Sequence, residues 1–123
     1  MIFGIGADII EMRRIRNMYR ITDDPFVKKT YTEREQEEGA RWSEPALYFA
    51  TRFAGKEAVF KSLGIDGSNI RLNEIEILGS ETGQLNITLS GYTGKEAEKK
   101  GIKEVLISLS YNDEYAIAFA IAQ

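Results

Sequence analysis

The sequence contains neither cysteine nor histidine. The absence of cysteine excludes a disulfide framework, a thiolate nucleophile and a cysteine-based zinc site. The absence of histidine removes the most common general base and a frequent ligand of soft metal ions. Any chemistry must therefore use carboxylates, lysine, arginine, hydroxyl groups or a hard metal ion.

An excess of positive charge and a long hydrophobic run are also missing. Lysine and arginine number 16 against 19 aspartate and glutamate residues, which gives a net charge of −3. Proteins that bind nucleic acid usually carry a large basic excess, so only a local basic patch remains open here. Charges interrupt the apolar stretches well before bilayer-spanning length, and the N-terminus lacks the features of a signal peptide. We therefore predict a cytoplasmic protein that binds neither nucleic acid nor a membrane.

The composition that is present is typical of a compact protein. Hydrophobic residues make up 43% of the 123 residues and charged residues 28%, with only two prolines. This balance favours an ordered fold over a disordered chain. The length predicts one domain, residues 1–123, with one hydrophobic core.

The N-terminal pattern predicts a strand followed by a helix. In residues 1–10, large apolar side chains alternate with Gly4, Gly6 and Asp8. We expect the apolar side to lie in the core and the glycine side to stay almost bare, which would leave Asp8 accessible. In residues 11–20 the apolar positions recur with helical period and arginines lie opposite them, so we predict a short amphipathic helix.

Capping signals predict three further helix starts and ends. A capping box of Thr32 and Glu35 predicts a helix that runs through Glu38 and ends at Gly39. The longest helix is predicted over residues 44–63, with Ser43 as its N-cap, Pro45 in its first turn and Gly64 at its C-terminal end. A cap and first turn are also predicted at Asp23, Asp24 and Pro25.

The C-terminal half is predicted to be mainly strands. Alternation with period two predicts strands over residues 72–78, 85–89, 105–110 and 115–122, with turns at 81–83 and 112–113 and a short polar helix over 94–100. Alanines leave one face of the last strand smooth enough to pack against a helix or another subunit. The predicted fold class is α+β, with one long central helix packed on a mainly antiparallel sheet.

Two carboxylates and a lysine form the strongest candidate site. Glu57 falls in the apolar stripe of the long helix, where a buried charge must be paired or bound to a metal. Lys61 follows at i+4, so an ordinary ion pair and a metal site are equally compatible with the helix alone. Taken alone, Asp8 is better explained as a cap on the helix that follows it. Together Asp8, Glu57 and Lys61 suit Mg²⁺ and a phosphate substrate, with room for a phosphate near Gly64, and this combination indicates phosphoryl transfer.

A cluster of positive charge lies on the first helix. Arg13, Arg14, Arg16 and Arg20 occur within about two turns, with Met18 at i+4 from Arg14. A solvated basic face is the ordinary interpretation. The alternative is that Arg14 and an exposed Met18 dock an acidic partner helix.

Two long motifs resemble those of the phosphopantetheinyl transferases of the holo-acyl-carrier-protein synthase type. Residues 4–11 read G-I-G-A-D-I-I-E and resemble the opening motif of these enzymes. Residues 52–64 read R-F-A-G-K-E-A-V-F-K-S-L-G and resemble the signature R-F-A-x-K-E-A-x-x-K-x-x-G. Further similarity is found at residues 31–35, 75–77, 89–91 and 107–116, so the resemblance spans nearly the whole chain.

The resemblance implies a fold, a reaction and an assembly. Family members are small α+β homotrimers with active sites at subunit interfaces. They use Mg²⁺ to transfer 4′-phosphopantetheine from coenzyme A to a serine of apo acyl carrier protein, which releases adenosine 3′,5′-bisphosphate and supports fatty acid biosynthesis. The resemblance implies Asp8 and Glu57 as metal ligands and catalytic residues, with Lys61 as the catalytic lysine. The proton acceptor would be Glu57 or a metal-bound water.

The resemblance also assigns binding residues. Arg14 and Met18 match the positions that dock the carrier protein, and Arg52, Lys61 and Gly64 match the region that binds coenzyme A. Tyr111 stands where the family has a histidine near the coenzyme phosphates; a phenol can donate a hydrogen bond there but adds no positive charge. Because of this difference, one alternative function is that of a non-catalytic paralogue that binds carrier protein or coenzyme A. A second alternative, based on the alanine face of the last strand, is a structural oligomerisation module.

Overall fold

The computed structural model describes residues 1–19, 25–79 and 83–123. Its helices are α1 (Met12–Tyr19), α2 (Pro25–Thr30), α3 (Glu33–Ala40), α4 (Pro45–Leu63) and α5 (Gly91–Lys99), with short 3₁₀ turns at Gly67–Asn69 and Leu72–Glu74. Its strands are β1 (Gly4–Glu11), β2 (Ile75–Leu78), β3 (Asn86–Leu89), β4 (Val105–Tyr111) and β5 (Tyr115–Ala122). The predicted features at Arg20, Asp23, Asp24, Glu81 and Thr82 lie outside the described residues.

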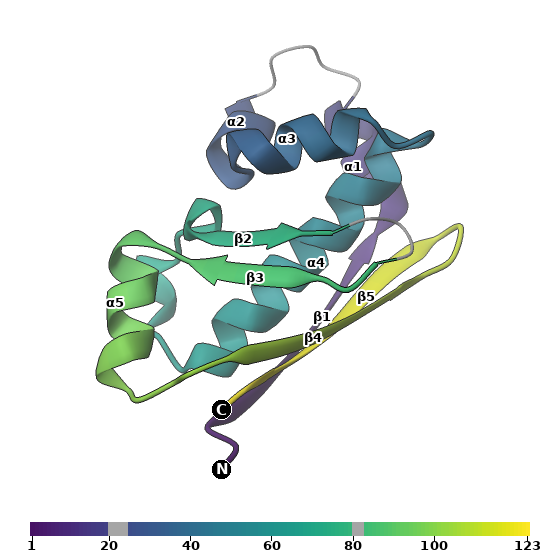
Figure 1. The fold of residues 1–123 in the computed structure, drawn as a ribbon. Coiled ribbons are helices and arrows are strands. Elements are labelled where there is room, and N and C mark those ends of the chain that lie inside the picture. The colour runs from purple at the N-terminus through teal and green to yellow at the C-terminus, as the bar shows by residue number, and fades with distance from the viewer. Residues whose placement is uncertain (20–24, 80–82) are drawn as a thin grey trace.

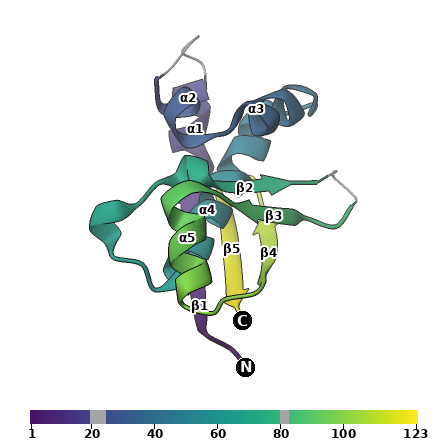
Figure 2. The same ribbon diagram turned by 60° about the vertical axis from the view of Figure 1, so that its left-hand side comes forward.

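The strands form two antiparallel sheets with α4 packed against both. One sheet has the order β1-β5-β4 and the other is the β2–β3 hairpin. Helix α4 contacts β1 and β5 on one side and β2 on another, so it forms the centre of the fold (Figure 1). Helices α1, α2 and α3 gather at one end of the molecule and α5 lies at the other (Figures 1 and 2). This arrangement confirms the predicted α+β class with a long central helix.

The side of β1 that faces the core is the opposite of the predicted one. A Cβ atom on Gly4 would lie 2.3 Å from the carbonyl oxygen of Ser62, and one on Gly6 would lie 2.0 Å from that of Ala58. These glycines therefore let α4 approach the strand backbone directly. The apolar side chains between them point away from α4, and Ile5 is 72% exposed. The prediction was wrong because missing side chains can mark a close helix contact as well as an open surface.

Strand β5 has one face in the core and one outside it. Its alanines are at most 2% exposed and lie against α4, which confirms that this face packs on a helix. The register pairs Ala7 with Phe119, and Phe119 is 55% exposed. The side of the β1-β5-β4 sheet that faces away from α4, here called the outer sheet face, consists of Ile5, Ala7, Ile9, Leu106, Ser108, Ser110, Tyr115, Ile117, Phe119 and Ile121.

The helix ends agree with the predictions in part. The capping box of Thr32 and Glu35 is present, and Gly64 closes α4 in the left-handed conformation with φ 69°. Helix α3 continues through Gly39 to Ala40, and a Cβ on Gly39 would lie 2.5 Å from the ring of Tyr48, so this glycine serves packing and does not end the helix. Ser43 is not the N-cap of α4, because the preceding turn extends one residue further to Glu44.

Some strand and helix bounds also differ. Residues Leu72–Glu74 form a 3₁₀ turn before β2, Leu85 precedes β3, and α5 begins at Gly91, three residues before the predicted start. The carboxylate of Glu74 explains the earlier start, because it accepts hydrogen bonds from the N–H groups of Tyr92 and Thr93 in the first turn of α5. No helix among the described ranges is long and apolar enough to cross a bilayer.

Candidate active site

Asp8, Glu57 and Lys61 come together where β1 packs on α4. Lys61 Nζ lies 3.3 Å from Asp8 Oδ1 and donates a hydrogen bond to the carbonyl oxygen of Ala7 at 3.0 Å. The carboxylate of Asp8 therefore contacts Lys61 of α4. Within the part of the chain that the structure describes, it does not cap α1, the helix that follows β1. The sequence predicted that Asp8, Glu57 and Lys61 lie together, and this geometry agrees with that prediction.

Glu57 lies within electrostatic reach of both partners. It is half-buried on α4, one turn before Lys61. Burial raises the pKa of the Glu57 carboxyl, the negative charge of Asp8 raises this pKa further, and the positive charge of Lys61 lowers it. Among residues 1–19, 25–79 and 83–123, Glu57 forms no hydrogen bond or ion pair. The i,i+4 ion pair that the sequence allowed between Glu57 and Lys61 is therefore not formed, and Lys61 pairs with Asp8 instead.

An open pocket of about 250 Å³ adjoins this cluster. It is lined by Ala7, Asp8, Ile9, Lys61 and Ile117. Because β1 is an edge strand of its sheet, the Asp8 side chain reaches the surface beside α4. Asp8 and Lys61 therefore stand at the margin of a space large enough for a small polar group such as a phosphate.

The donor set fits a hard divalent cation that also binds a substrate. Asp8 and Glu57 supply two carboxylates, and Mg²⁺ in proteins is often held by one or two carboxylates while substrate phosphates and water complete its coordination. Within the described part of the chain, no group of three or more acidic, histidine or cysteine side chains could enclose a metal. The pair thus suits a shared magnesium site better than a closed protein cage.

Gly64 follows Lys61 at the end of α4. Its N–H donates to the carbonyl oxygen of Lys61 at 3.4 Å, and its positive φ allows the chain to turn away from the helix. The residue is exposed, and the ring of Phe3 approaches it. The backbone at Gly64 is thus exposed three residues after Lys61, with the ring of Phe3 beside it.

Arg52 and Tyr111 line a second pocket. Its other lining residues are Trp42, Thr51, Gly83, Leu85 and Leu109. The Arg52 guanidinium is buried: it donates to the carbonyl oxygen of Gly79 at 3.1 Å, lies 3.4 Å from Glu38 Oε2 and stands 4.3 Å from the ring centroid of Tyr48. Tyr111 is 55% exposed, so it is the more accessible of the two predicted coenzyme-binding side chains.

The two pockets lie on different sides of α4. Arg52 and Lys61 are separated by nine residues. At 100° per residue this separation places them about 180° apart around the helix, and the rise places them about 13 Å apart along it. One subunit therefore presents the Lys61 region and the Arg52 region in different directions.

The basic patch on α1 contains both paired and unpaired arginines. Arg13 pairs with Glu11 at 3.5 Å and Arg16 with Glu44 at 3.6 Å. Arg14 is exposed and forms no ion pair within the described residues. Met18 is half-buried and packs against the core, so the expectation of an exposed methionine was wrong.

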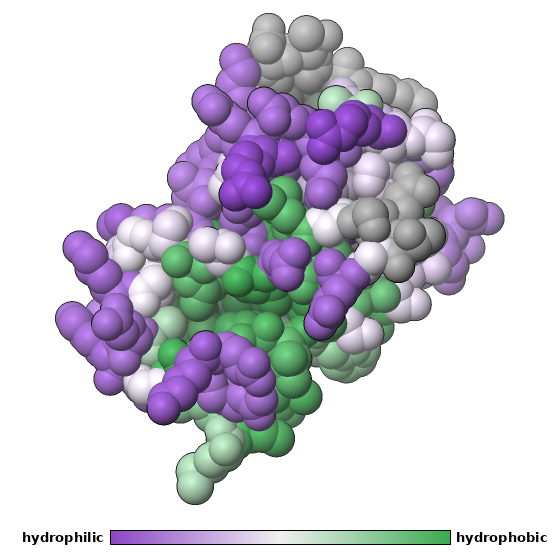
Figure 3. Space-filling view, in the orientation of Figure 1, coloured by the Kyte–Doolittle hydropathy of each residue, from purple (hydrophilic) through white to green (hydrophobic). Residues whose placement is uncertain are grey.

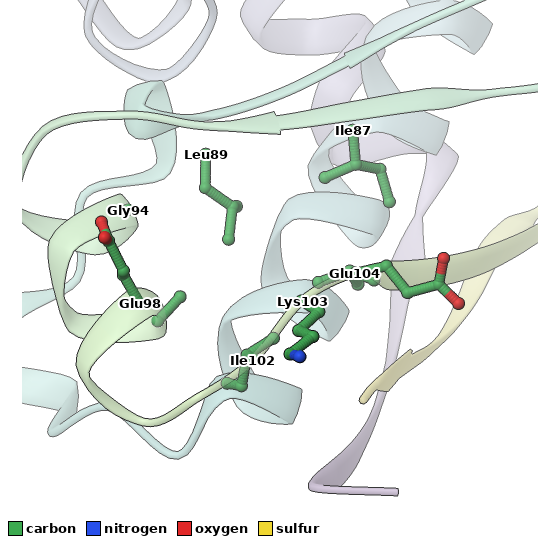
Figure 4. A pocket seen from close by; sticks show the side chains of 9 residues that line it. Ile87, Leu89, Gly94, Glu98, Ile102, Lys103 and Glu104 are labelled. Carbon is green, nitrogen blue, oxygen red and sulfur yellow. The ribbon is translucent and has the colours of Figure 1, made fainter. Parts of the chain in front are cut away.

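A third pocket lies between β3, α5 and β4. Figure 3 shows a hydrophobic area over β3 and β4 between two hydrophilic areas. Figure 4 shows Ile87 and Leu89 of β3 on one side of the pocket, with Ile102 and Lys103 on the other. No residue that the sequence singled out for chemistry lines this pocket, so we do not assign the reaction to it.

The structure also adds residues that the sequence motifs did not single out. Ile117 borders the Asp8 pocket, and Trp42 borders the Arg52 pocket. Glu35 and Lys56 form a buried ion pair behind the site. In the sequence, Glu35 was recognised only as part of a capping box, and Lys56 only as one position of the motif over residues 52–64. Neither pattern predicts that the two side chains pair with each other.

Comparisons with known proteins identify the class. The sequence matches the 4′-phosphopantetheinyl transferase superfamily over residues 4–120. The chain is 38% identical over 121 residues to a holo-[acyl-carrier-protein] synthase of Natranaerobius thermophilus, with 98% of this chain and 97% of that protein covered.

Solved structures agree. The fold superposes on the holo-[acyl-carrier-protein] synthase of Neisseria meningitidis with a TM-score of 0.86 at 31% identity, covering 100% of this chain and 99% of that one. It superposes on the enzyme of Bacillus anthracis in complex with coenzyme A with a TM-score of 0.77 at 30% identity, covering 99% and 96%. The chain therefore belongs to the 4′-phosphopantetheinyl transferase superfamily, and it is similar to holo-[acyl-carrier-protein] synthases along nearly its whole length.

Proposed function

We propose that this protein transfers 4′-phosphopantetheine from coenzyme A to a serine of apo acyl carrier protein, the step that prepares a carrier for fatty acid biosynthesis. The observation that carries the proposal is the Asp8–Lys61 contact with Glu57 one turn away, at positions of the superfamily motifs. In the reaction, the serine oxygen forms a bond to the pantetheine-side phosphorus of the coenzyme. The bond from that phosphorus to the bridging oxygen breaks, and adenosine 3′,5′-bisphosphate leaves.

Asp8 and Glu57 would hold Mg²⁺. When bound, the ion neutralises charge on the phosphate oxygens. The serine proton would pass to Glu57, whose pKa is raised, or to a metal-bound water. Lys61 is half exposed, so its ammonium group can leave Asp8 and stabilise the departing bisphosphate.

Coenzyme A would be bound through the Lys61 and Gly64 region of one subunit and the Arg52 and Tyr111 region of a neighbour. The opposite orientation of these two regions on α4 supports a site shared between subunits. The apolar outer sheet face supports the assembly itself, because a contiguous apolar surface of this kind usually marks an interface. We propose a homotrimer on this basis and on the resemblance to the family.

The carrier would dock on α1. Arg14 is exposed and unpaired among the described residues, which suits contact with an acidic helix. Met18 would contribute its exposed part beside Arg14. The single domain over residues 1–123 and the cytoplasmic location stay predictions.

Intact-mass analysis tests the proposal. Apo carrier incubated with the protein, coenzyme A and Mg²⁺ should gain the mass of one phosphopantetheine group. Glu57→Gln should remove this activity while the protein stays folded, because the amide is nearly isosteric but is a poorer ligand for Mg²⁺. Full transfer by the variant at saturating Mg²⁺ would contradict the metal assignment. Binding of carrier and coenzyme by the wild type without any mass gain would favour the non-catalytic alternative.

A further inference from the structure

Lys56 and Glu35 form an ion pair in the interior of the protein. Lys56 Nζ lies 2.6 Å from Glu35 Oε1, and both side chains are fully buried. The same ammonium group donates hydrogen bonds to the carbonyl oxygens of Leu72, at 3.0 Å, and Ile75. Neither charged residue reaches a candidate pocket, so the pair needs an explanation of its own.

Glu35 extends the pair to two more segments. Its Oε1 accepts the N–H of Thr32 at 2.9 Å, and its Oε2 accepts the N–H of Ile77 at 2.8 Å. Thr32 caps α3 and Ile77 lies in β2. One buried pair therefore connects the start of α3, the middle of α4 and the strand β2.

Stability alone is a weak reason for such a pair. Removing two charges from water costs about as much as their attraction returns, and replacing a buried pair by neutral groups of similar size is often neutral or stabilising. Burial lowers the pKa of Lys56 below its usual value, and the carboxylate of Glu35 opposes this shift only in part. What the pair does supply is a set of directional bonds with fixed geometry.

The opposite side of α4 supplies few such bonds. There the helix packs on glycines of β1 and alanines of β5. This interface fixes how closely α4 approaches the sheet through steric contact, but apart from the Lys61 bond to Ala7 it adds few directional bonds.

The bonds to β2 supply directional restraint. Arg52 lies one turn before Lys56 on the same face of α4 and donates to the carbonyl oxygen of Ile77 at 3.3 Å. Lys56 donates to Ile75, two residues earlier in the same strand. Arg52 and Lys56 thus donate to alternate carbonyl oxygens of β2. These bonds define the rotation of α4 about its axis and its position along that axis relative to β2. Because Glu57 is the next residue, these bonds also define where its carboxylate stands relative to Asp8.

We propose that the Glu35–Lys56 pair is a positioning device, which holds α4 in the rotation and axial register that bring Glu57 and Lys61 beside Asp8. The inference rests on the proposed transferase function, since turnover is its readout. It assigns neither residue a contact with coenzyme A or with the carrier.

The test is the double variant Glu35→Gln with Lys56→Met. Glutamine and methionine have nearly the same size as the residues they replace, and the net charge of the protein does not change. The variant should unfold cooperatively at a temperature close to that of the wild type. Its kcat should fall about 10- to 100-fold, because a displacement of about 1 Å of a reacting group can cost on the order of 100-fold. The KM values for coenzyme A and carrier should stay unchanged.

The matched control is Glu96→Gln with Lys99→Met on α5. This surface pair has a separation of 3.2 Å, with Lys99 exposed and Glu96 partly buried, and its replacement removes the same two kinds of charge. Its kcat and both KM values should equal those of the wild type.

Two results would overturn the proposal: a folded double variant with the kcat of the wild type, or a loss of activity that resides in KM alone. If the double variant does not fold, Lys56→Gln alone decides by the same criteria, since the shorter neutral side chain removes the ammonium bonds to Leu72 and Ile75 but can still donate a hydrogen bond to Glu35. The wild type is measured in the same assay. A wild type without transfer would refute the proposed function, whereas an active wild type beside an active double variant would refute only the positioning role.

Discussion

At the scale of single residues, Lys61 has two possible partners in the candidate site. Its ammonium group contacts Asp8 at 3.3 Å, and its charge lowers the pKa of Glu57. The lysine is half exposed, so this contact is worth about 1 kcal/mol or less. In the proposed reaction, Lys61 would therefore exchange Asp8 for a substrate phosphate at a low cost in free energy.

The raised pKa of Glu57 predicts a specific pH dependence of metal binding. A carboxyl must be deprotonated to bind a cation. As the pH falls through the pKa of Glu57, affinity for a divalent ion should fall about tenfold for each pH unit. Because burial and Asp8 raise this pKa, the fall should begin at a higher pH than for an ordinary glutamate. Calorimetric titration with Mn²⁺, in place of Mg²⁺, measures the midpoint.

Lys61→Met serves as the comparison for that titration. Since the lysine lowers the pKa of Glu57, its removal should move the midpoint to higher pH. Above the midpoint the variant should bind Mn²⁺ up to about fivefold more tightly, since Asp8 no longer has a competing cation. A midpoint that does not move would show that Lys61 and Glu57 do not interact.

The sequence alone grouped Asp8, Glu57 and Lys61 into one candidate site, but it did not predict which of them form contacts. The position of Glu57 in an apolar stripe indicated a paired or metal-bound charge; Asp8 and Lys61 lie within electrostatic reach of it, but among the described residues Glu57 forms no ion pair. Periodicity could not show that Lys61 reaches across to β1, because the partner of a surface lysine depends on which strand the helix packs against. For the same reason, the extent to which Arg52 is engaged by Glu38 and Gly79 could not be foreseen.

At the scale of elements, the contact between β1 and α4 depends on glycine. Gly6→Ala would place a Cβ 2.0 Å from the carbonyl oxygen of Ala58, which is backbone of the central helix and has little room to move. Such overpacking is expected to lower the free energy of unfolding by about 1–3 kcal/mol or more. Chemical denaturation measures the change.

Gly67→Ala is the matched control for that substitution. No heavy atom lies within 4 Å of the Cβ that this change would add. Its stability should equal or slightly exceed that of the wild type, because alanine restricts the unfolded chain. Equal stability of both variants would mean that α4 and β1 are not in close contact.

The basic patch on α1 gives a prediction about the partner. Arg14→Glu should raise the KM for apo carrier several-fold without changing binding of coenzyme A, because a negative charge would then face an acidic helix. Added salt should reduce the difference. Steady-state kinetics at low and high salt measure it. Lys95→Glu makes the same change of charge at an exposed position on α5 and should have no effect; equal effects of both variants would indicate a general effect of net charge.

The elements with strong end signals were predicted well. Pro45 and Gly64 delimited α4, and the capping box located α3. The side of β1 was predicted wrongly because alternation separates two faces without showing which of them meets the helix. Both faces of this strand can be covered, one by α4 and the other by the proposed neighbouring subunit, so apolar residues need not mark the intramolecular side.

At the scale of the whole molecule, the outer sheet face should control assembly. Phe119→Glu would place a charge at the middle of this apolar surface, opposite Ala7 in the register. Burying an unpaired carboxylate in an interface is costly, so the variant should be largely monomeric and should lose most of its transfer activity. Analytical ultracentrifugation measures the mass. Ile70→Glu changes an exposed apolar residue outside this face and should leave assembly intact; a trimeric Phe119→Glu would contradict the proposed interface.

The pairing of β1 with β5 brings the two ends of the described chain together. The N–H of Phe3 donates to the carbonyl oxygen of Ala122 at 2.7 Å, and N and C lie side by side in Figure 1. A short linker could join these ends, and new ends could be opened at Gly101, where no heavy atom lies within 4 Å of an added Cβ. In such a circular permutant the strand pair now most distant in sequence would become a local hairpin. Since local contacts shorten the search for native pairing, the rearranged chain should fold faster into the same architecture.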